Sequence, residues 1–297
     1  MIIFQQRRDF GEKINASFTF TMENLRGLGL SLLLIVGPVA LVGGIISGYA
    51  QSTLLTGTSP GTFSDPSKVF AMYAAMFSGP WLVGLVLVLL SYVLVNVVTF
   101  SYIRLYQQRG GQQPITVGEV WAATQPFIGS GVLLTIAVSL LAGVGMIFLV
   151  LPGLYLLIVF SITPAILVFE GQGVGESISR SFRLISGNWW ATFGLLFVMS
   201  LIVSIMSMIF TLPAGIVGGL FGAGVVKDIS ILTTVFTALG TVGSMVLQGL
   251  NAVATAFQYY DLKEEKEGTG LLAQINAIGE TDQPGTLRPT RNEEGEY

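Results

Sequence analysis

Six long apolar runs without a charged residue are the feature that most limits how this chain can fold. The chain is 52% hydrophobic and 10% charged, whereas an average soluble domain is about 25% charged. A hydrocarbon core about 30 Å thick is crossed by about 20 helical residues, so runs of this length predict membrane-spanning helices. The fold class expected is therefore an all-α integral membrane protein with six transmembrane helices. The runs are residues 28–49, 81–102, 128–151, 153–169, 190–212 and 233–257.

The third and fourth runs are separated only by Leu151-Pro152-Gly153. Proline lacks a backbone donor and clashes with the preceding helical turn, and a glycine follows it here. We therefore expect a tight hairpin turn at this position rather than one very long helix. A related outer turn is expected at Leu212-Pro213-Ala214-Gly215.

One short segment of the chain recurs without a gap. Residues 11–24 and 175–188 share six residue types at the same spacing, and a fainter third copy starts at Gly118-Glu119. Each copy precedes an apolar run, which predicts three parallel repeats of an interfacial amphipathic helix followed by a membrane hairpin. The repeat units expected cover about residues 10–106, 114–170 and 174–262 of a membrane domain at 1–262.

The recurring segments have the spacing of amphipathic helices. Ile178, Phe182 and Ile185 fall on one helical face in the last copy. In the middle copy, Pro126 is expected to end the short helix early. The simplest interpretation is that these helices only anchor the chain and feed it into the bilayer. A gate or a docking surface is the alternative.

Two segments connect the runs on the side opposite the recurring segments. In residues 50–80, Asp65-Pro66 predicts a helix start, with Asp as the cap and Pro at the first helical position. The following residues, 69–77, are expected to form a short apolar helix on the outer membrane face. The segment 213–228 is rich in glycine, and the sequence alone does not say whether it is mobile or closely packed.

The basic residues are distributed unevenly between the two sides. Twelve Lys and Arg residues fall on one side of the expected spans, and only Lys68 and Lys227 fall on the other. Short loops rich in Lys and Arg stay in the cytoplasm. Both termini are therefore expected in the cytoplasm of a bacterium, with the protein in its cytoplasmic membrane. Residues 1–10 have no apolar core, so no signal peptide is expected there.

Residues 263–297 are expected to form a cytoplasmic tail. Leu271, Leu272, Ile275 and Ile278 form an apolar stripe at helical spacing, which predicts a short amphipathic helix at 270–279. Such a helix lies on the bilayer or fills a partner's groove. The flanking residues 263–267 are not basic, which favours a protein partner or the protein's own cytoplasmic face. The polar remainder, 280–297, is expected to be disordered. The acidic balance of the chain comes from this tail, and no patch suited to nucleic acid is visible.

Chemistry-bearing residues are scarce in this chain. There is no histidine and no cysteine, so the commonest general base and metal ligand are missing, and we expect no catalytic, cofactor-binding or metal site. The polar residues inside the runs that stand out are Asn96, Gln248 and Asn251. They are either helix-to-helix hydrogen-bonding groups or the lining of a substrate or water pathway, and both interpretations remain open.

The second half of the chain carries a set of short motifs within, between and at the ends of the last three runs. They are Leu151-Pro152-Gly153-Leu154-Tyr155, Pro164, Glu170-Gly171, Glu176-Ser177, Ser181-Phe182, Leu184, Gly187-Asn188-Trp189 and Tyr259-Tyr260-Asp261-Leu262. With these motifs the chain resembles the membrane domain associated with bacterial glycerophosphodiester phosphodiesterases and related six-span families of unknown function. The resemblance is best over residues 150–262 and implies an all-helical membrane domain. No phosphodiesterase domain is expected, because the six spans use up the chain.

Two functions are consistent with these patterns. The first is a non-enzymatic membrane subunit or scaffold, because the spans carry no ionisable group. The second is an uncoupled transporter or lipid-handling protein, based on the repeats and the three intramembrane polar residues. The partners expected are the lipid bilayer and other membrane or cytoplasmic proteins, with a homo-oligomer as a further alternative.

Overall fold

The computed structural model describes residues 2–57, 65–111, 113–226 and 228–268. Every regular element in these residues is a helix, and none of them forms a strand. Six helical stretches are long and apolar enough to cross a membrane, which confirms the all-α membrane class. The elements are α1 (Phe10–Glu23), α2 (Leu25–Ser31), the π-helix η1 (Leu32–Val36), α3 (Gly37–Gly57), α4 (Pro66–Ala75), α5 (Gly79–Gln108), α6 (Val117–Phe148), α7 (Val150–Phe160), α8 (Thr163–Glu170), α9 (Val174–Ile185), α10 (Trp189–Gly222) and α11 (Ser230–Glu267).

Two of the six spans are built from consecutive helices. The first span joins α2, η1 and α3, and the fourth joins α7 and α8. The fourth span is interrupted at residues 161–162, and Pro164 lies in the first turn of α8. A proline is tolerated there because the amide at the start of a helix has no intrahelical partner. The other spans are α5, α6, α10 and α11.

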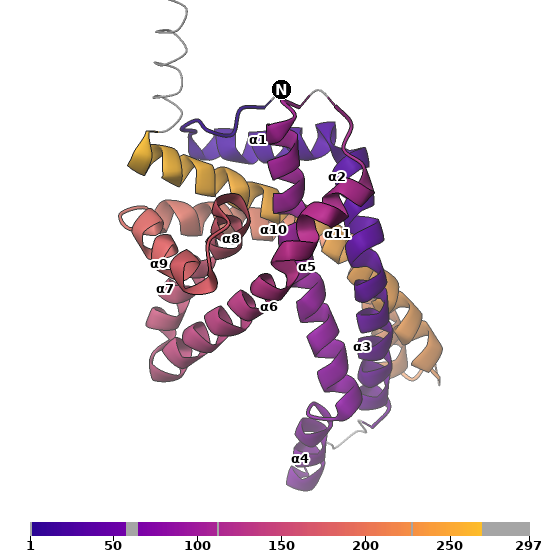
Figure 1. Cartoon of the computed structure of the whole chain (residues 1–297). Coiled ribbons are helices and arrows are strands. Elements are labelled where there is room, and N and C mark those ends of the chain that lie inside the picture. Colours follow the sequence, from indigo (N-terminus) through magenta and orange to yellow (C-terminus); the bar gives the residue numbers. More distant parts are fainter. Residues whose placement is uncertain (1, 58–64, 112, 227, 269–297) are drawn as a thin grey trace, which may run out of the picture.

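The core of the protein lies toward one end of the bundle. Residues 93–103 of α5 and 249–262 of α11 are buried almost without interruption, and α1, α8 and α9 pack around them. Figure 1 shows α1 lying across this end, whereas α4 lies at the opposite end. Only 17% of the most apolar window is buried in α6, α10 and α11, which leaves most of those side chains available to lipid.

The third and fourth runs form the expected α6–α7 hairpin, but its break lies at Leu149, just before the predicted turn residues Leu151-Pro152-Gly153, which are part of α7. Leu149 adopts an extended conformation between the two helices, and Pro152 lies in the first turn of α7. At Gly153 the two helices come so close that an added Cβ would lie 2.7 Å from the backbone nitrogen of Met146. Figure 1 shows this hairpin diverging from α3 and α5.

Two other prolines do not act as the sequence patterns suggest. Pro126 lies inside α6, which continues for 22 residues beyond it to Phe148, so the expectation that it ends a short helix is wrong. Pro213 likewise lies inside α10, so no turn forms there and the connection to α11 is only residues 223–229. A helix in a membrane protein tolerates an interior proline because neighbouring groups can satisfy the freed carbonyl.

The capping of α4 follows the sequence prediction. Asp65 is the N-cap residue, and its carboxylate accepts hydrogen bonds from the Ser67 backbone nitrogen at 3.0 Å and the Ser67 hydroxyl at 2.7 Å. Pro66 occupies the first helical position, where its missing amide hydrogen costs nothing. The short helix therefore begins at the predicted residue.

The recurring Gly-Glu pairs share one local structure. Glu12, Glu119 and Glu176 each lie in the first turn of a helix and accept a hydrogen bond from the backbone nitrogen of the residue three positions earlier. This contact satisfies an amide that would otherwise lack a partner. It explains why glutamate recurs at that position, while the repeat arrangement and the domain division stay predictions.

The buried face of α9 differs from the predicted stripe. Ile185 is buried and Ile178 is half-buried, but Phe182 is 39% exposed. Its ring contacts Phe160 of α7 edge-on at 5.5 Å. The fully buried positions include Ser181, whose hydroxyl bonds the Ile178 carbonyl at 2.7 Å. Small serines thus allow α9 to approach the bundle more closely than the large apolar residues alone would allow.

Candidate functional site

Hydrogen bonds of the described residues link two of the three polar residues predicted inside the spans. The amide nitrogen of Asn96 donates to the carbonyl of Tyr92 in its own helix at 2.9 Å. The amide nitrogen of Asn251 reaches Gln248 at 3.4 Å and the hydroxyl of Ser200 at 3.3 Å. Gln248 and Asn251 thus lie together and join α11 to α10, and Asn96 is not part of that group.

These contacts are typical of hydrogen bonds between membrane helices. A polar group in hydrocarbon needs a partner, and such bonds between helices are worth about 0.6–2 kcal/mol each. The five best-defined cavities are not lined by Asn96, Gln248 or Asn251. The tail residues Leu271, Leu272, Ile275 and Ile278 lie outside the described residues.

The most elaborate polar arrangement lies instead around the end of α11. We call it the charged layer and define it by Lys13, Glu170, Arg180, Asp261 and Lys263. These residues come from α1, α8, α9 and α11, which are far apart in the sequence. The layer adjoins the buried core described above and includes the aspartate of the Tyr259-Tyr260-Asp261-Leu262 motif.

Lys13 and Asp261 form the buried half of the charged layer. The Lys13 ammonium lies 2.7 Å from an Asp261 carboxylate oxygen, and the two side chains are only 6% and 11% exposed. The ammonium also donates to the side-chain oxygen of Gln258 at 2.9 Å. The Gln258 amide nitrogen donates in turn to the hydroxyl of Thr192 on α10 at 2.9 Å. A buried ion pair of this kind is stable only when further hydrogen bonds satisfy both groups.

Glu170 and Arg180 form the second half of the charged layer. The Arg180 guanidinium binds both carboxylate oxygens of Glu170 at 3.0–3.1 Å and also contacts Glu267 near the end of α11. The Tyr259 hydroxyl donates to Glu170 at 2.7 Å, and Lys263 lies 4.0 Å from the same carboxylate. Burial alone would lower the pKa of Arg180, but the hydrogen bonds to the two glutamates outweigh it and raise that pKa.

Further contacts extend the anchoring of α11 to α5 and α10. The Tyr260 hydroxyl donates to the Gln107 side chain at 2.8 Å, and the Asn188 amide donates to Glu265 at 3.0 Å. The last turns of α11 are therefore bonded to α1, α5, α8, α9 and α10. In the sequence, the charged layer is visible only as a set of opposite charges directly outside the apolar runs. Their spacing does not show which of them pair.

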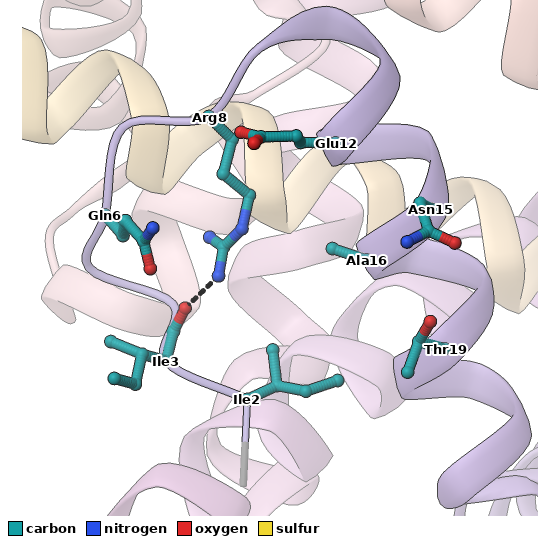
Figure 2. A pocket seen from close by; sticks show the side chains of 8 residues that line it. All are labelled: Ile2, Ile3, Gln6, Arg8, Glu12, Asn15, Ala16 and Thr19. Atoms are coloured by element: carbon teal, nitrogen blue, oxygen red, sulfur yellow. Dashed lines mark hydrogen bonds between the residues drawn. The ribbon is translucent and has the colours of Figure 1, made fainter.

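The segment before α1 is anchored to the same end. The Phe4 ring is buried, stacks on Phe257 at 4.6 Å and meets Phe20 edge-on at 5.2 Å. The Arg8 backbone nitrogen donates to Asp261 at 2.9 Å, and its guanidinium bonds the Ile3 carbonyl, as Figure 2 shows. Burial lowers the pKa of Arg8, and the nearby carboxylates partly offset this shift.

An open hollow of about 400 Å³ lies between this segment and α1. Figure 2 shows Arg8 reaching across it while Asn15 and Thr19 line it from α1. The hollow is wide and is lined by both polar and apolar residues, so it does not enclose a group of reactive side chains. Most charges of the neighbouring layer are paired with opposite charges, which makes that layer suited to holding helices together.

The comparison with protein families concerns the part of the chain that carries these features. A family described as "Domain of unknown function (DUF7847)" matches residues 83–262, which is more than half of the chain. The chain belongs to this family. The DUF7847 match begins in α5, ends at the Tyr259-Tyr260-Asp261-Leu262 motif and includes α8, α9, α10 and most of α11.

One curated relative also matches. A UPF0259 membrane protein of Pectobacterium carotovorum subsp. carotovorum (strain PC1) is 39% identical over 70 residues, which cover 24% of this chain and 28% of that protein. No solved structure matches the chain. The protein is thus a membrane protein of unknown function. Neither match points to the phosphodiesterase-associated domain specifically, so that finer resemblance is not confirmed.

Proposed function

We propose that this protein is a non-enzymatic integral membrane subunit or scaffold of a bacterial cytoplasmic membrane complex. The observation that carries the proposal is the anchoring of the last turns of α11 by the charged layer. This helix leads directly into residues 269–297. Because the last turns of α11 are held rigidly, the tail that follows them starts from a fixed position. Binding a partner there costs less entropy than it would after a mobile helix end.

The polar groups of the spans support the same proposal. The amide nitrogens of Asn96 and Asn251 donate hydrogen bonds within or between helices, and the side-chain oxygen of Gln248 accepts one of them. A transporter coupled to protons or sodium usually needs an intramembrane carboxylate or a cluster of oxygen ligands. The six apolar runs contain no charged residue, which favours a structural role for them.

The proposal is tested by isolating the protein with its partners from native membranes in mild detergent. We expect a protein partner at near-equal stoichiometry. Deleting residues 269–297, or replacing the stripe Leu271, Leu272, Ile275 and Ile278 by serine, should release it. Deleting only 280–297 is the matched control and should leave the complex intact. A stripe variant that still holds the partner, or the absence of any partner, would contradict the proposal.

Lipid handling is the second candidate function, and one cavity favours it. A cavity of about 150 Å³ with an apolar lining lies between the α1–η1 segment and helices α10 and α11. Phe18, Leu25 and Leu32 line it on one side, and Met206 and Leu250 on the other. An apolar cavity of this size stays dry and accepts apolar groups, which suits part of an acyl chain. Purification with one enriched lipid class and no protein partner would favour this candidate over a scaffold.

A further inference from the structure

One cavity lies where three spans meet the expected membrane surface. It has a volume of about 470 Å³ and is lined by the α1–α2 junction, the end of α5 and the segment that leads into α6. The first candidate span begins at Leu25, the second ends at Gln108 and the third begins at Val117. Span ends lie at the level of lipid headgroups, so this cavity opens at that level.

Two opposite charges line the cavity without neutralising each other. Glu23 ends α1 and Arg26 lies in the first turn of α2, and Asn24 between them has a non-helical backbone. Neither side chain has an ion pair or a hydrogen bond to another described residue. This differs from the charged layer, where acidic and basic groups bind each other. A ligand that carries both charges would complement both side chains at once.

Further groups at the cavity suit a phosphate. Tyr106 lines the cavity, and its hydroxyl accepts a hydrogen bond from the Ile2 backbone nitrogen at 3.3 Å, which leaves its own proton to donate. The guanidinium of Arg26 can bind two oxygens of one phosphate. The carboxylate of Glu23 accepts hydrogen bonds from a primary ammonium but not from a quaternary one.

The apolar residues below the cavity are suited to lipid chains. Arg26, Leu30 and Leu34 are spaced four residues apart and therefore follow one face of the first span. Leu30 and Leu34 are 43% and 59% exposed. Trp121, also exposed, lies one turn after the start of the third span, at the position that interfacial tryptophans prefer.

We propose that this cavity binds the headgroup of a zwitterionic aminophospholipid. Arg26 and Tyr106 hold the phosphate, Glu23 holds the primary ammonium, and the acyl chains follow Leu30 and Leu34. The site is independent of the partner-binding tail proposed above, because it lies on different helices and uses different residues.

Native mass spectrometry of the detergent-solubilised full-length protein tests this site. The protein is incubated with equal amounts of phosphatidylethanolamine, phosphatidylglycerol and phosphatidylcholine that carry the same acyl chains. One charge at the surface is worth about 1 kcal/mol, or about a fivefold change in affinity. We therefore expect about fivefold more retained phosphatidylethanolamine than either other lipid. Equal retention of all three, or a preference for phosphatidylglycerol, would overturn the proposal.

Three variants separate the roles of the charges. Arg26→Gln should lower the retention of phosphatidylethanolamine and phosphatidylglycerol alike, by about fivefold. Glu23→Gln should remove the preference for phosphatidylethanolamine and favour phosphatidylglycerol instead. Arg183→Gln, which changes an exposed arginine on α9, should behave like the unchanged protein. Unchanged retention in the Arg26 variant, an unchanged preference in the Glu23 variant, or a change of either kind in the Arg183 variant would contradict the site.

A soluble headgroup distinguishes a lipid from a free phosphodiester. Glycerophosphoethanolamine carries both charges but no acyl chains, so we expect it to leave bound phosphatidylethanolamine in place at equal concentration. Displacement at that concentration would assign the cavity to a soluble ligand and overturn the lipid proposal. All variants are first compared by thermal unfolding, and because Glu23 and Arg26 are exposed, unchanged midpoints are expected.

Discussion

The ammonium of Lys13 lies 2.7 Å from the carboxylate of Asp261, a residue 248 positions later in the chain. The two side chains are almost fully buried, so each neutralises a charge that the protein interior would otherwise hold unpaired. Among the described residues, the contact joins the first helix, α1, to the last, α11. Removing either side chain would leave the charge of the other one buried and unpaired.

Removing one member of this pair should strongly destabilise the protein. Asp261→Asn leaves the Lys13 ammonium buried without a counter-charge, which costs about 3–5 kcal/mol. The midpoint of thermal unfolding in detergent, measured by tryptophan fluorescence, should be clearly lower than that of the unchanged protein. Glu265→Gln is the control, because its pair with Arg7 is long and exposed and is worth at most about 1 kcal/mol. Equal midpoints for both variants would contradict the prediction.

Gly153→Ala should disturb the α6–α7 hairpin. The added methyl group would lie 2.7 Å from the Met146 backbone nitrogen, so the helices must separate, at a cost of about 1–3 kcal/mol. Gly143→Ala places the same methyl group in α6, where no atom lies within 4 Å. That control should be neutral or slightly stabilising. Thermal unfolding of both variants tests this difference in stability. Equal midpoints for the two variants would contradict the close approach of α6 and α7 at Gly153.

Arg180→Lys should loosen α9 although it keeps the charge. Lysine cannot reproduce the two-point contact of the guanidinium with Glu170, and we expect a loss of about 1–2 kcal/mol. This loss should appear as faster amide hydrogen exchange in α9 than in the unchanged protein. Arg183→Lys on the same helix is the control, because Arg183 is exposed, and protection that is equal in both variants would argue against the contact with Glu170.

The capping of α4 should depend on pH. The hydrogen bond from the Ser67 hydroxyl, then that from its backbone nitrogen, lowers the pKa of Asp65. The stabilisation is therefore present above the unfolded-state pKa of about 4 and is lost as the pH falls through the lower folded pKa. Protection factors of the first-turn amides should fall over that range. Asp65→Asn keeps a capping group that does not titrate, so an equal decrease in that variant would contradict the assignment.

The membrane architecture was readable from the sequence because its determinants are local. Apolar runs require helices in lipid whatever their neighbours are, and the Asp65 cap and the break near Pro152 are decided within a few residues. Pro126 and Pro213 were misread because a proline inside a long membrane helix is tolerated when neighbouring groups compensate. That compensation depends on tertiary contacts, which one sequence does not specify.

The polar sites were harder to predict for a similar reason. Asn96, Gln248 and Asn251 stand out as polar residues in apolar runs, but only the fold decides that Asn251 meets Ser200 while Asn96 bonds its own helix. The charged layer was missed because its members lie just outside the runs, where charges are expected and usually solvated. Their pairing requires α1, α8 and α9 to meet at the end of α11.

The way α11 is anchored limits which changes this part of the chain can accept. Between Gln258 and Glu267, successive side chains point to different partners on α1, α5, α8, α9 and α10. Inserting or deleting one residue would rotate every later side chain by about 100° and break these contacts together. A single substitution affects only the contacts of one side chain, so during divergence this stretch can vary in residue type while its length stays constant.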